Sequence, residues 1–145
     1  MSQPDQSFDN HAKLVPVFHG TLAFMIMVPM LYFVYLAVTD FSVERLVFAL
    51  FMVGALSMGW HARLFPLRVQ DRLIRLEEQL RLHRVLAEDQ QGRISDISTD
   101  LLIGLRFAPD DEVVDLAGRI LEGELADRKA VKQAVKNWRA DNQRI

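Results

Sequence analysis

The sequence contains no cysteine, which excludes disulfide bridges, thiol nucleophiles and thiolate metal sites. It also lacks a glycine-rich nucleotide loop, a His-Glu-x-x-His metal motif, a nucleophile elbow and a calcium-loop pattern. Tandem repeats and low-complexity runs are absent. The net charge of −2 provides no bulk attraction to nucleic acid or another polyanion. These absences favour a non-enzymatic protein with no nucleic-acid partner and no identifiable small-molecule substrate.

Two long apolar segments dominate the first half of the chain. They cover residues 14–39 and 46–62, and the first contains no residue with a fixed charge. A helix that crosses the hydrocarbon core of a bilayer needs about 20 apolar residues, so the first segment is long enough. The second lies between Arg45 and Arg63 and is near the lower limit, but arginine side chains extend such a span by reaching toward the interfaces. The pattern predicts two transmembrane helices joined by the polar link 40–45.

Other interpretations of these segments fit less well. A signal peptide has a basic start and an apolar run of about 7–15 residues, whereas here the run is longer and Asp5 and Asp9 precede it. A soluble domain of this size offers little cover for two buried apolar segments. Pro29 lies inside the first segment, and transmembrane helices tolerate such a proline. We expect a kink there, and whether it is a passive bend or a hinge stays open.

Basic residues are unevenly distributed around the two segments. Arg63, Arg68, Arg72 and Arg75 follow the second segment, whereas the link contains only Arg45. The positive-inside rule therefore predicts a protein of the inner (cytoplasmic) membrane with both termini cytoplasmic and the link outside. The first three of these arginines are candidate contacts to lipid headgroups.

The periodicity along the whole chain predicts an all-α fold. The second membrane helix is expected to continue into the cytoplasm as a stalk, and a small helical bundle follows it. No segment alternates with period two, so no sheet is expected. The four expected parts are a polar N-terminal segment (1–13), a two-helix transmembrane hairpin (14–66), a helical stalk (67–90) and a cytoplasmic helical tail (91–145).

Three helices are expected in the tail. They cover about residues 98–107, 111–122 and 127–139. Gly123 is suited to end the second helix, and Asp127 is suited to cap the start of the third.

Beyond Pro66 the stalk shows a spacing of four and three residues. The residues on this seam are Val69, Leu73, Leu76, Leu80 and His83. This is a heptad pattern of about two repeats, whereas a coiled coil is normally assigned from three or four. Two interpretations remain open: this helix packs against the tail's own helices, or its seam binds a protein partner or another copy of the chain. Leu73, Leu76 and Leu80 are the candidate partner-binding residues.

His19 and His61 are the candidate metal ligands. Each lies near the cytoplasmic end of its apolar segment, at a similar level if the segments fold back on each other. Two imidazoles at one level can ligate haem iron or another metal. Interfacial histidines more commonly have a structural role, so no cofactor is expected and haem is the alternative.

Ala55 and Gly59 form a small-xxx-small pair on the second segment. Small residues at this spacing let two membrane helices approach closely. Packing against the first segment is the simplest interpretation, and a homodimer or a foreign helix is the alternative.

The end of the chain is rich in basic residues. Lys129, Lys132, Lys136 and Arg139 recur at a spacing of three and four residues. On one continuous helix they would form a basic face opposite Trp138. Such a face is usually solvated, but it can also lie on an anionic leaflet.

Several stretches resemble a bacterial family of small two-span membrane proteins, known as a domain of unknown function. The resemblance rests on residues 16–19 (PVFH), 67–78 (LRVQDRLIRLEE), 102–108 (LIGLRFA), 132–138 (KQAVKNW) and Asp141. It implies two membrane helices, a charged stalk and a helical tail, and it implies no activity, cofactor or catalytic residue.

The sequence thus predicts a non-enzymatic membrane anchor or accessory subunit. Its partners would be membrane lipids and a protein bound by the cytoplasmic helices, either a different chain or a second copy. A haem-binding redox subunit and a sensor of anionic lipid are the alternatives.

Overall fold

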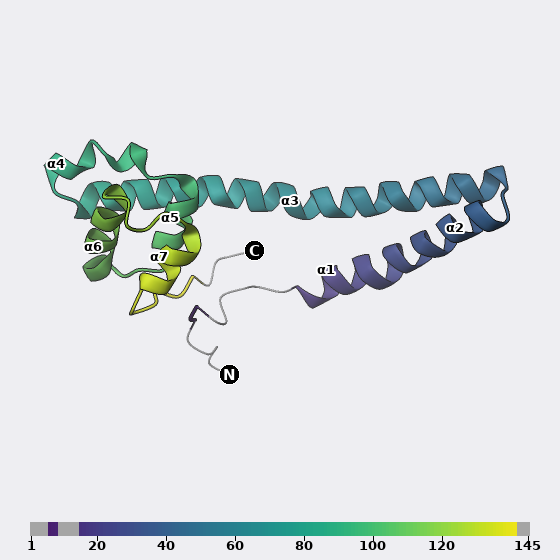
Figure 1. Cartoon of the computed structure of the whole chain (residues 1–145), viewed down its shortest axis with the longest axis horizontal. Helices are drawn as coiled ribbons and strands as arrows, with labels where there is room; N and C mark the ends of the chain where they lie inside the picture. The colour runs from purple at the N-terminus through teal and green to yellow at the C-terminus, as the bar shows by residue number, and fades with distance from the viewer. Residues whose placement is uncertain (1–5, 9–14, 142–145) are drawn as a thin grey trace. The chain divides into compact units, whose positions relative to one another are not determined.

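The computed structural model describes residues 6–8 and 15–141, and these are helical without any strand (Figure 1). The predicted all-α class is confirmed. The elements are α1 (Pro16–Gly20), the π-helix η1 (Thr21–Met27), α2 (Val28–Thr39), α3 (Val43–Val85), α4 (Glu88–Gln91), the 3₁₀-helix η2 (Ile94–Asp96), α5 (Thr99–Leu105), α6 (Asp110–Leu121) and α7 (Arg128–Ala134).

The chain divides into two compact units at Pro66. The apolar unit is the described part of residues 13–66, and the tail unit is the described part of residues 67–145 together with residues 6–8. Helix α3 belongs to both, because Pro66 lies inside it without ending it. The two units are described in turn.

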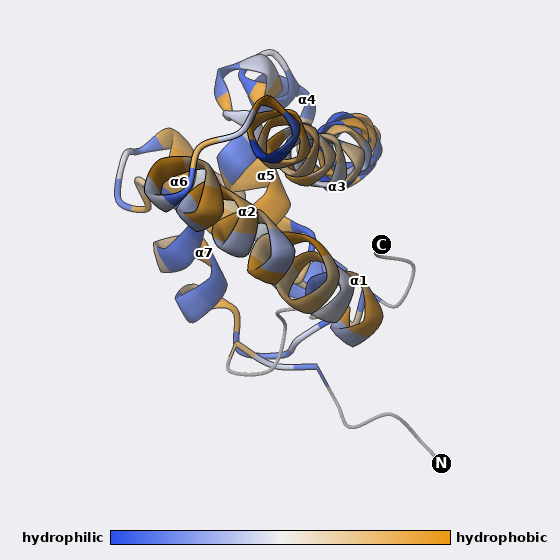
Figure 2. Ribbon diagram, turned by 90° about the vertical axis from the view of Figure 1, so that its right-hand side faces the viewer, coloured by the Kyte–Doolittle hydropathy of each residue, from blue (hydrophilic) through white to orange (hydrophobic). Residues whose placement is uncertain are grey.

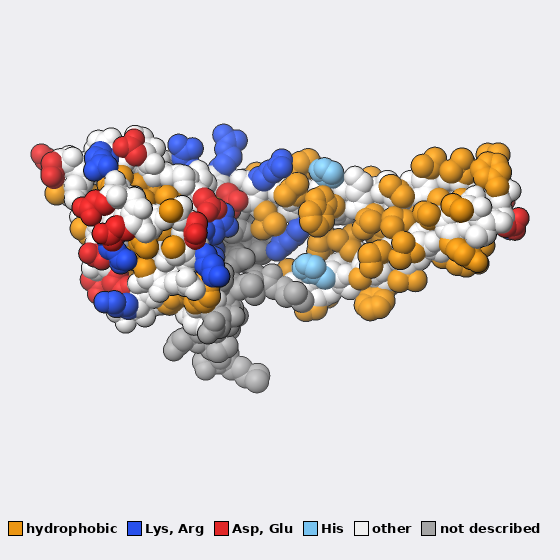
Figure 3. All heavy atoms as spheres, in the orientation of Figure 1, with side chains coloured by type: hydrophobic (Ala, Val, Ile, Leu, Met, Phe, Trp, Pro, Cys, Tyr) orange, Lys and Arg blue, Asp and Glu red, His pale blue; other side chains and the backbone are white. Residues whose placement is uncertain are grey.

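The apolar unit contains two helical stretches that are long and apolar enough to cross a membrane. They are Pro16–Thr39, which comprises α1, η1 and α2, and helix α3. Their most apolar 18-residue windows are 0% and 6% buried, whereas the core helix of a soluble protein is mostly covered by its own chain. Apolar side chains accordingly cover much of the surface of this unit in Figure 3, and apolar colours predominate along α2 in Figure 2.

Pro29 alters the first stretch without breaking it. A proline has no N–H to donate and its ring crowds the carbonyl one turn earlier. The residues before it form the π-helix η1, and the N–H of Val28 donates to the carbonyl of Ala23, five residues back. A π-helical turn is one recognised way to accommodate such a defect. The effect of Pro29 therefore takes the form of this wider turn.

The two apolar stretches contact each other at two levels. Near the link, the rings of Phe33 and Phe48 stack with centroids 5.2 Å apart. Further along, a Cβ added to Gly59 would lie 2.5 Å from Cδ2 of Leu22. The missing side chain of Gly59 therefore makes room for Leu22, as expected if the pair with the half-buried Ala55 packs against the first stretch.

The tail unit has its own hydrophobic core. It is centred on side chains that are 0% exposed, including Leu82, Leu102 and Leu105. Burying one such leucine contributes roughly 1.5–3 kcal/mol. The remaining core is supplied by the segment 94–97, by α5, α6 and α7, and by Leu86, Ala108, Leu125 and Val135 in the connecting segments, with Trp138 packed against its edge.

The starts and stops of the tail helices mostly follow the sequence signals. Ser98 and Asp127 cap α5 and α7 by accepting from the N–H groups of Leu101 and Ala130. Gly123 follows α6 with a φ of 84°, the left-handed conformation that favours glycine. The expected end of the last helix near Arg139 is wrong, because α7 ends at Ala134.

We predict that Gly59→Val disrupts packing within the apolar unit. The new side chain would overlap Leu22, and overpacking of this kind costs about 1–3 kcal/mol. Gly54→Val is the matched control, because a Cβ at Gly54 meets nothing within 4 Å. The measurement is SDS titration of the detergent-solubilised protein, followed by Trp60 fluorescence in a Trp138→Phe background. Equal midpoints for the two variants would contradict the predicted contact.

Candidate functional site

A stripe of apolar side chains lies exposed along the part of α3 that belongs to the tail unit. We call Val69, Leu73, Leu76 and Leu80 the leucine stripe. Their exposed fractions are 66%, 53%, 55% and 57%. His83, the last position of the predicted seam, is exposed as well. Scattered exposed leucines are common, but a contiguous apolar surface marks a candidate interaction site.

The tail packs against a different face of the same helix. Ile74, Leu82 and Leu86 are 6%, 0% and 5% exposed, and the last two belong to the tail core. Since successive helix residues are about 100° apart at 3.6 residues per turn, Ile74 and Leu82 lie away from the stripe. The tail therefore packs against this helix, as one interpretation expected, but through the face opposite the predicted seam. Binding of a partner by Leu73, Leu76 and Leu80 stays a prediction.

Two charged residues on the packed face are also buried. Glu78 is 2% exposed and Arg81 is 5% exposed. The Nη1 atom of Arg81 donates to Oε2 of Glu78 over 3.1 Å, and its Nη2 atom donates to the carbonyl of Ala108 over 2.8 Å. Its Nε atom donates over 2.6 Å to Oδ1 of Asp110, in the first turn of α6. A single guanidinium thus connects α3 to the α5–α6 turn and to the start of α6.

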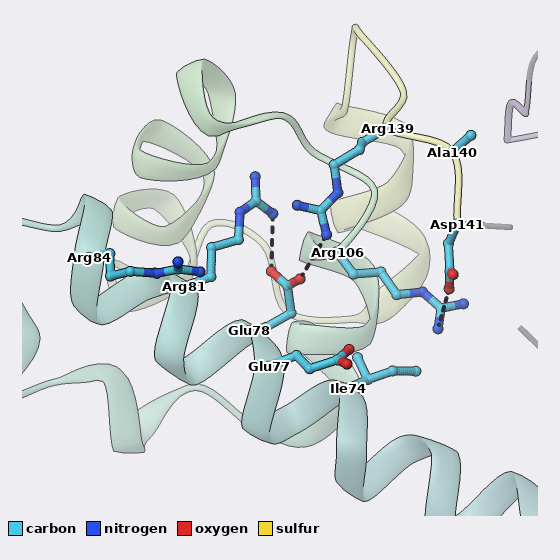
Figure 4. A pocket seen from close by; sticks show the side chains of 9 residues that line it. All are labelled: Ile74, Glu77, Glu78, Arg81, Arg84, Arg106, Arg139, Ala140 and Asp141. Atoms are coloured by element: carbon cyan, nitrogen blue, oxygen red, sulfur yellow. Dashed lines mark hydrogen bonds and ion pairs between the residues drawn. The ribbon is translucent and has the colours of Figure 1, made fainter. Parts of the chain in front are cut away.

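The C-terminal segment joins the same group of charges (Figure 4). Nη2 of Arg139 lies 3.4 Å from Oε1 of Glu78, and Nη1 of Arg106 lies 3.2 Å from Oδ2 of Asp141. The guanidinium of Arg106 also lies over the ring of Phe107, with Cζ 4.5 Å from the centroid. We call this set the arginine–carboxylate cluster: Glu78, Arg81, Arg106, Asp110, Arg139 and Asp141.

A pocket of about 480 Å³ opens onto this cluster. Four arginines line it, together with Glu77, Glu78 and Asp141, while Asp110 neutralises Arg81 from the side. The positive and negative charges of these eight residues cancel. The pocket therefore has no excess charge with which to attract an ionic ligand. The cluster is best explained as a structural set of ion pairs that connects α3 to the rest of the tail.

The pKa values of two of the cluster carboxylates, Glu78 and Asp110, shift in opposite directions for different reasons. Desolvation raises the pKa of Glu78 above its ordinary value, although Arg81 and Arg139 oppose that shift. The hydrogen bond from Arg81 and its charge lower the pKa of Asp110. A raised carboxyl pKa means that the folding free energy gained from Glu78 falls as the pH rises past its ordinary value. The buried pair Glu78 and Arg81 therefore adds little to the stability of the fold. Its main effect is to determine how α3, the α5–α6 turn and α6 pack together.

A second carboxylate holds the segment that follows α7. Oε2 of Glu112 accepts from the N–H of Lys136 over 2.9 Å, and its Oε1 accepts from the N–H of Asn137 over 3.0 Å. The N–H of Arg139 then donates to the carbonyl of Phe107 over 2.7 Å. These N–H groups bond outside the helix, which is the physical reason why α7 stops early. Trp138 still packs, with its ring 4.7 Å from that of Phe107.

The chain matches a known protein family along its whole length. All of residues 1–145 match DUF6526, described as a family of unknown function. The chain belongs to this family. No curated protein and no solved structure matches it. Membership in DUF6526 assigns no activity, and the bacterial origin and two-span character implied by the earlier resemblance stay predictions.

The expected basic face of this DUF6526 protein does not form. Lys132 is 8% exposed, and its Nζ lies 5.3 Å from the centroid of the Phe107 ring. Lys136 and Arg139 lie beyond the end of α7, and Arg139 pairs with Glu78. Of the three lysines in this set, Lys129 and Lys136 are exposed and Lys132 is not, so a lipid-sensing role for the four residues on one helical face loses its geometric basis. Their contact with lipid stays a prediction.

The basic residues after the second apolar segment are more accessible. Arg68 and Arg72 are exposed and Arg63 is half-buried. Arg72 forms no ion pair with any residue in the described part of the chain. These side chains are accessible to lipid headgroups, and that contact also stays a prediction.

The two candidate metal ligands are exposed and each bonds to its own helix. Nδ1 of His19 lies 2.8 Å from the carbonyl of Val15, and Nδ1 of His61 lies 2.8 Å from the carbonyl of Ser57. A carbonyl can only accept, so Nδ1 is the donor in each contact, and in the neutral imidazole Nε2 is then the nitrogen with the lone pair. Within the described residues, no group of three or more His, Asp or Glu side chains is placed to hold a metal ion.

The arginine–carboxylate cluster is the feature that the sequence analysis missed. One signal was present: Ile74, Glu78 and Leu82 recur every four residues on the face opposite the predicted seam. A glutamate in the middle of an apolar row indicates a buried charge that needs a partner. The partners Arg106, Asp110 and Arg139 are distant in sequence, and no local pattern identifies them.

We predict that Arg81→Ala destabilises the tail unit by about 3 kcal/mol, because breaking a buried ion pair leaves an uncompensated charge. Arg84→Ala is the matched control. Arg84 is exposed and forms no ion pair with the described residues, so we expect a change within about 0.5 kcal/mol. The measurement is denaturant unfolding of the full-length protein, followed by Trp138 fluorescence in a Trp60→Phe background. Similar effects of the two substitutions would contradict a structural role for the cluster.

We also predict an acid-sensitive contribution from Glu112. The N–H of Lys136 lowers the pKa of this carboxyl below its ordinary value of 4.5, so the stabilisation is present above that pH and is lost as the pH falls below it. Glu112→Ala should cost about 1 kcal/mol at pH 7, a figure reduced for solvent screening. The stability difference from the unmodified protein should shrink toward pH 3.

The control for this prediction is Asp111→Ala, because Asp111 is an exposed neighbour at the start of the same helix. It should show a smaller effect at pH 7. A difference between Glu112→Ala and the unmodified protein that stays constant from pH 7 to pH 3 would show that the carboxylate does not hold residues 136–137.

Proposed function

We propose that this DUF6526 protein is a non-enzymatic membrane anchor that docks a protein partner. Its apolar unit forms a transmembrane hairpin in the inner (cytoplasmic) membrane, with both termini on the cytoplasmic side. The tail unit lies in the cytoplasm, where the leucine stripe binds the partner. The protein thereby holds that partner at the membrane surface.

The exposure of the leucine stripe carries this proposal. The tail unit buries Leu82, Leu102 and Leu105 completely but leaves Leu73, Leu76 and Leu80 more than half exposed. Sequestering these three leucines from water would contribute several kcal/mol, since each full burial is worth roughly 1.5–3 kcal/mol. Because the folded unit leaves this apolar surface exposed, the surface is available to bind a partner.

The membrane location is supported by the uncovered apolar unit and by charge. Two stretches of sufficient length and apolarity leave at least 94% of their most apolar windows outside any protein core, and lipid is a solvent that accepts such surfaces. The exposed arginines that follow the apolar part of α3 favour the cytoplasmic side. Asp40 and Arg45, which form an ion pair, keep the link polar and suit it to the opposite side.

The redox alternative has one observation in its favour. In both His19 and His61 the Nδ1 atom faces a backbone carbonyl, so in the neutral imidazole Nε2 is the nitrogen that can coordinate a metal. Metal-ligating histidines commonly donate their other N–H to a carbonyl in this way. The same bond also forms when a histidine simply satisfies its own helix, so docking is the better supported function.

We predict that the double variant Leu76→Ala and Leu80→Ala loses association but keeps its membrane location. Truncating anchor residues at an interface typically costs more than 1 kcal/mol each, so the complex should weaken at least about tenfold. The readout is native mass spectrometry of full-length protein extracted from its own membrane in mild detergent, with resistance to alkaline extraction as the test of insertion. Val114→Ala is the control, since Val114 is an exposed apolar residue of α6 outside the stripe.

An unchanged complex size in the double variant would refute docking through the stripe. Release of the unmodified protein by alkaline extraction would refute the membrane anchor. The same sample decides the redox alternative, because bound haem adds its mass and a Soret absorption band that either histidine substitution removes.

A further inference from the structure

We infer that the occupant of the leucine stripe is a second copy of this chain, which pairs with the first as a short parallel coiled coil. In this arrangement Arg72 of each copy forms an ion pair with Glu77 of the other. The inference rests on the proposed docking role of the stripe and adds the identity, orientation and register of the partner.

The heptad register follows from the spacing of the stripe. Val69 and Leu76 occupy d positions, and Leu73 and Leu80 occupy a positions. The residues that flank such a seam are at e and g, where charges set the partner and its orientation. Here g is occupied by Arg72 and Gln79, and e by Gln70, Glu77 and Arg84.

In a parallel pair, each g residue faces the e residue five positions later on the other helix. Arg72 therefore faces Glu77, and Gln79 faces Arg84. Twofold symmetry produces two attractive Arg72–Glu77 pairs and no pair of like charges. In an antiparallel pair g faces g, so Arg72 would meet Gln79 and the attraction would be lost. The charge pattern thus selects a parallel copy of the same sequence.

The structure leaves these charges available. Arg72 and Glu77 are both exposed, and within the described residues neither forms an ion pair. The neighbouring Glu78 and Arg81, by contrast, are already paired with each other in the arginine–carboxylate cluster on the packed face. The tail therefore occupies one face of α3 and leaves the heptad face complete, with its stripe and its flanking charges.

The proposed membrane anchor compensates for the shortness of the seam. Two heptads alone provide little surface for a stable coiled coil. Copies inserted in one bilayer with the same orientation send their α3 helices in the same direction, as a parallel pair requires. Confinement to the membrane also raises the effective concentration and so reduces the entropic cost of association.

The absence of cysteine makes a direct test possible. Val69→Cys and Leu80→Cys each introduce a single thiol into the full-length chain. In a parallel pair each cysteine meets its own counterpart, so both variants should form disulfide-linked dimers when native membranes are oxidised. In an antiparallel pair the two like cysteines would be separated by about 16 Å, from 11 residues at 1.5 Å each, which is too far for a disulfide.

The charge pair is tested in the Leu80→Cys background. Arg72→Glu places two like charges opposite each other in both symmetric positions, and we expect the dimer to weaken about tenfold. The double change Arg72→Glu with Glu77→Arg restores complementarity and should restore cross-linking. Arg75→Glu is the matched control, because Arg75 is exposed and lies at position c, away from the partner.

Three results would overturn the inference. Disulfides only in a mixture of the two cysteine variants would show antiparallel pairing. Equal cross-linking of Arg72→Glu and its control would refute the ion pair. A stripe-dependent complex that never cross-links and contains one copy with a different chain would leave docking intact but refute self-association. A complex that does not depend on the stripe would instead refute the docking function itself. Trp138 fluorescence verifies that each variant is folded.

Discussion

The structure of the tail unit depends on which face of helix α3 the other tail helices cover. One face carries Ile74, Glu78 and Leu82, and the opposite face carries the leucine stripe. The bundle of α5, α6 and α7 is small and covers only the first of these. Once Glu78 and Arg81 are buried there, the positions of the α5–α6 turn, the start of α6 and the segment around Arg139 are fixed by the hydrogen bonds and ion pairs that these two charges need.

This division of α3 has a cost in free energy. The unit buries the charged pair Glu78 and Arg81, which costs desolvation energy, while Leu73, Leu76 and Leu80 stay exposed to water. Burying the leucine face instead would provide more hydrophobic energy, but it would leave the partners of Glu78 and Arg81 without a site. A buried ion pair is a poor source of stability and a good source of specificity. Here it determines which face of α3 the tail takes and, by exclusion, which face is left open.

Local sequence signals predicted the elements better than their contacts. The apolar segments, the cap at Asp127 and the stop at Gly123 are encoded by neighbouring residues, and the structure contains them. The end of α7 was missed because the competing acceptors, Glu112 and the carbonyl of Phe107, lie more than 20 residues away in sequence. The same applies to the cluster, since nothing near Glu78 identifies Arg139 as its partner. The heptad seam was recognised, but its exposure could be known only after the tail had been placed on the other face.

The charge arrangement of α3 also bears on why self-association would need a membrane. A two-heptad seam with two ion pairs provides little affinity in solution, where exposed pairs are worth less than about 1 kcal/mol each. If the apolar unit spans a bilayer, translational and orientational freedom are reduced before the helices meet, so a weak seam is sufficient. The same weakness would make pairing sensitive to how many copies a membrane contains. Under this proposal the leucine stripe and the apolar segments act together, because the membrane provides the concentration and the stripe provides the register.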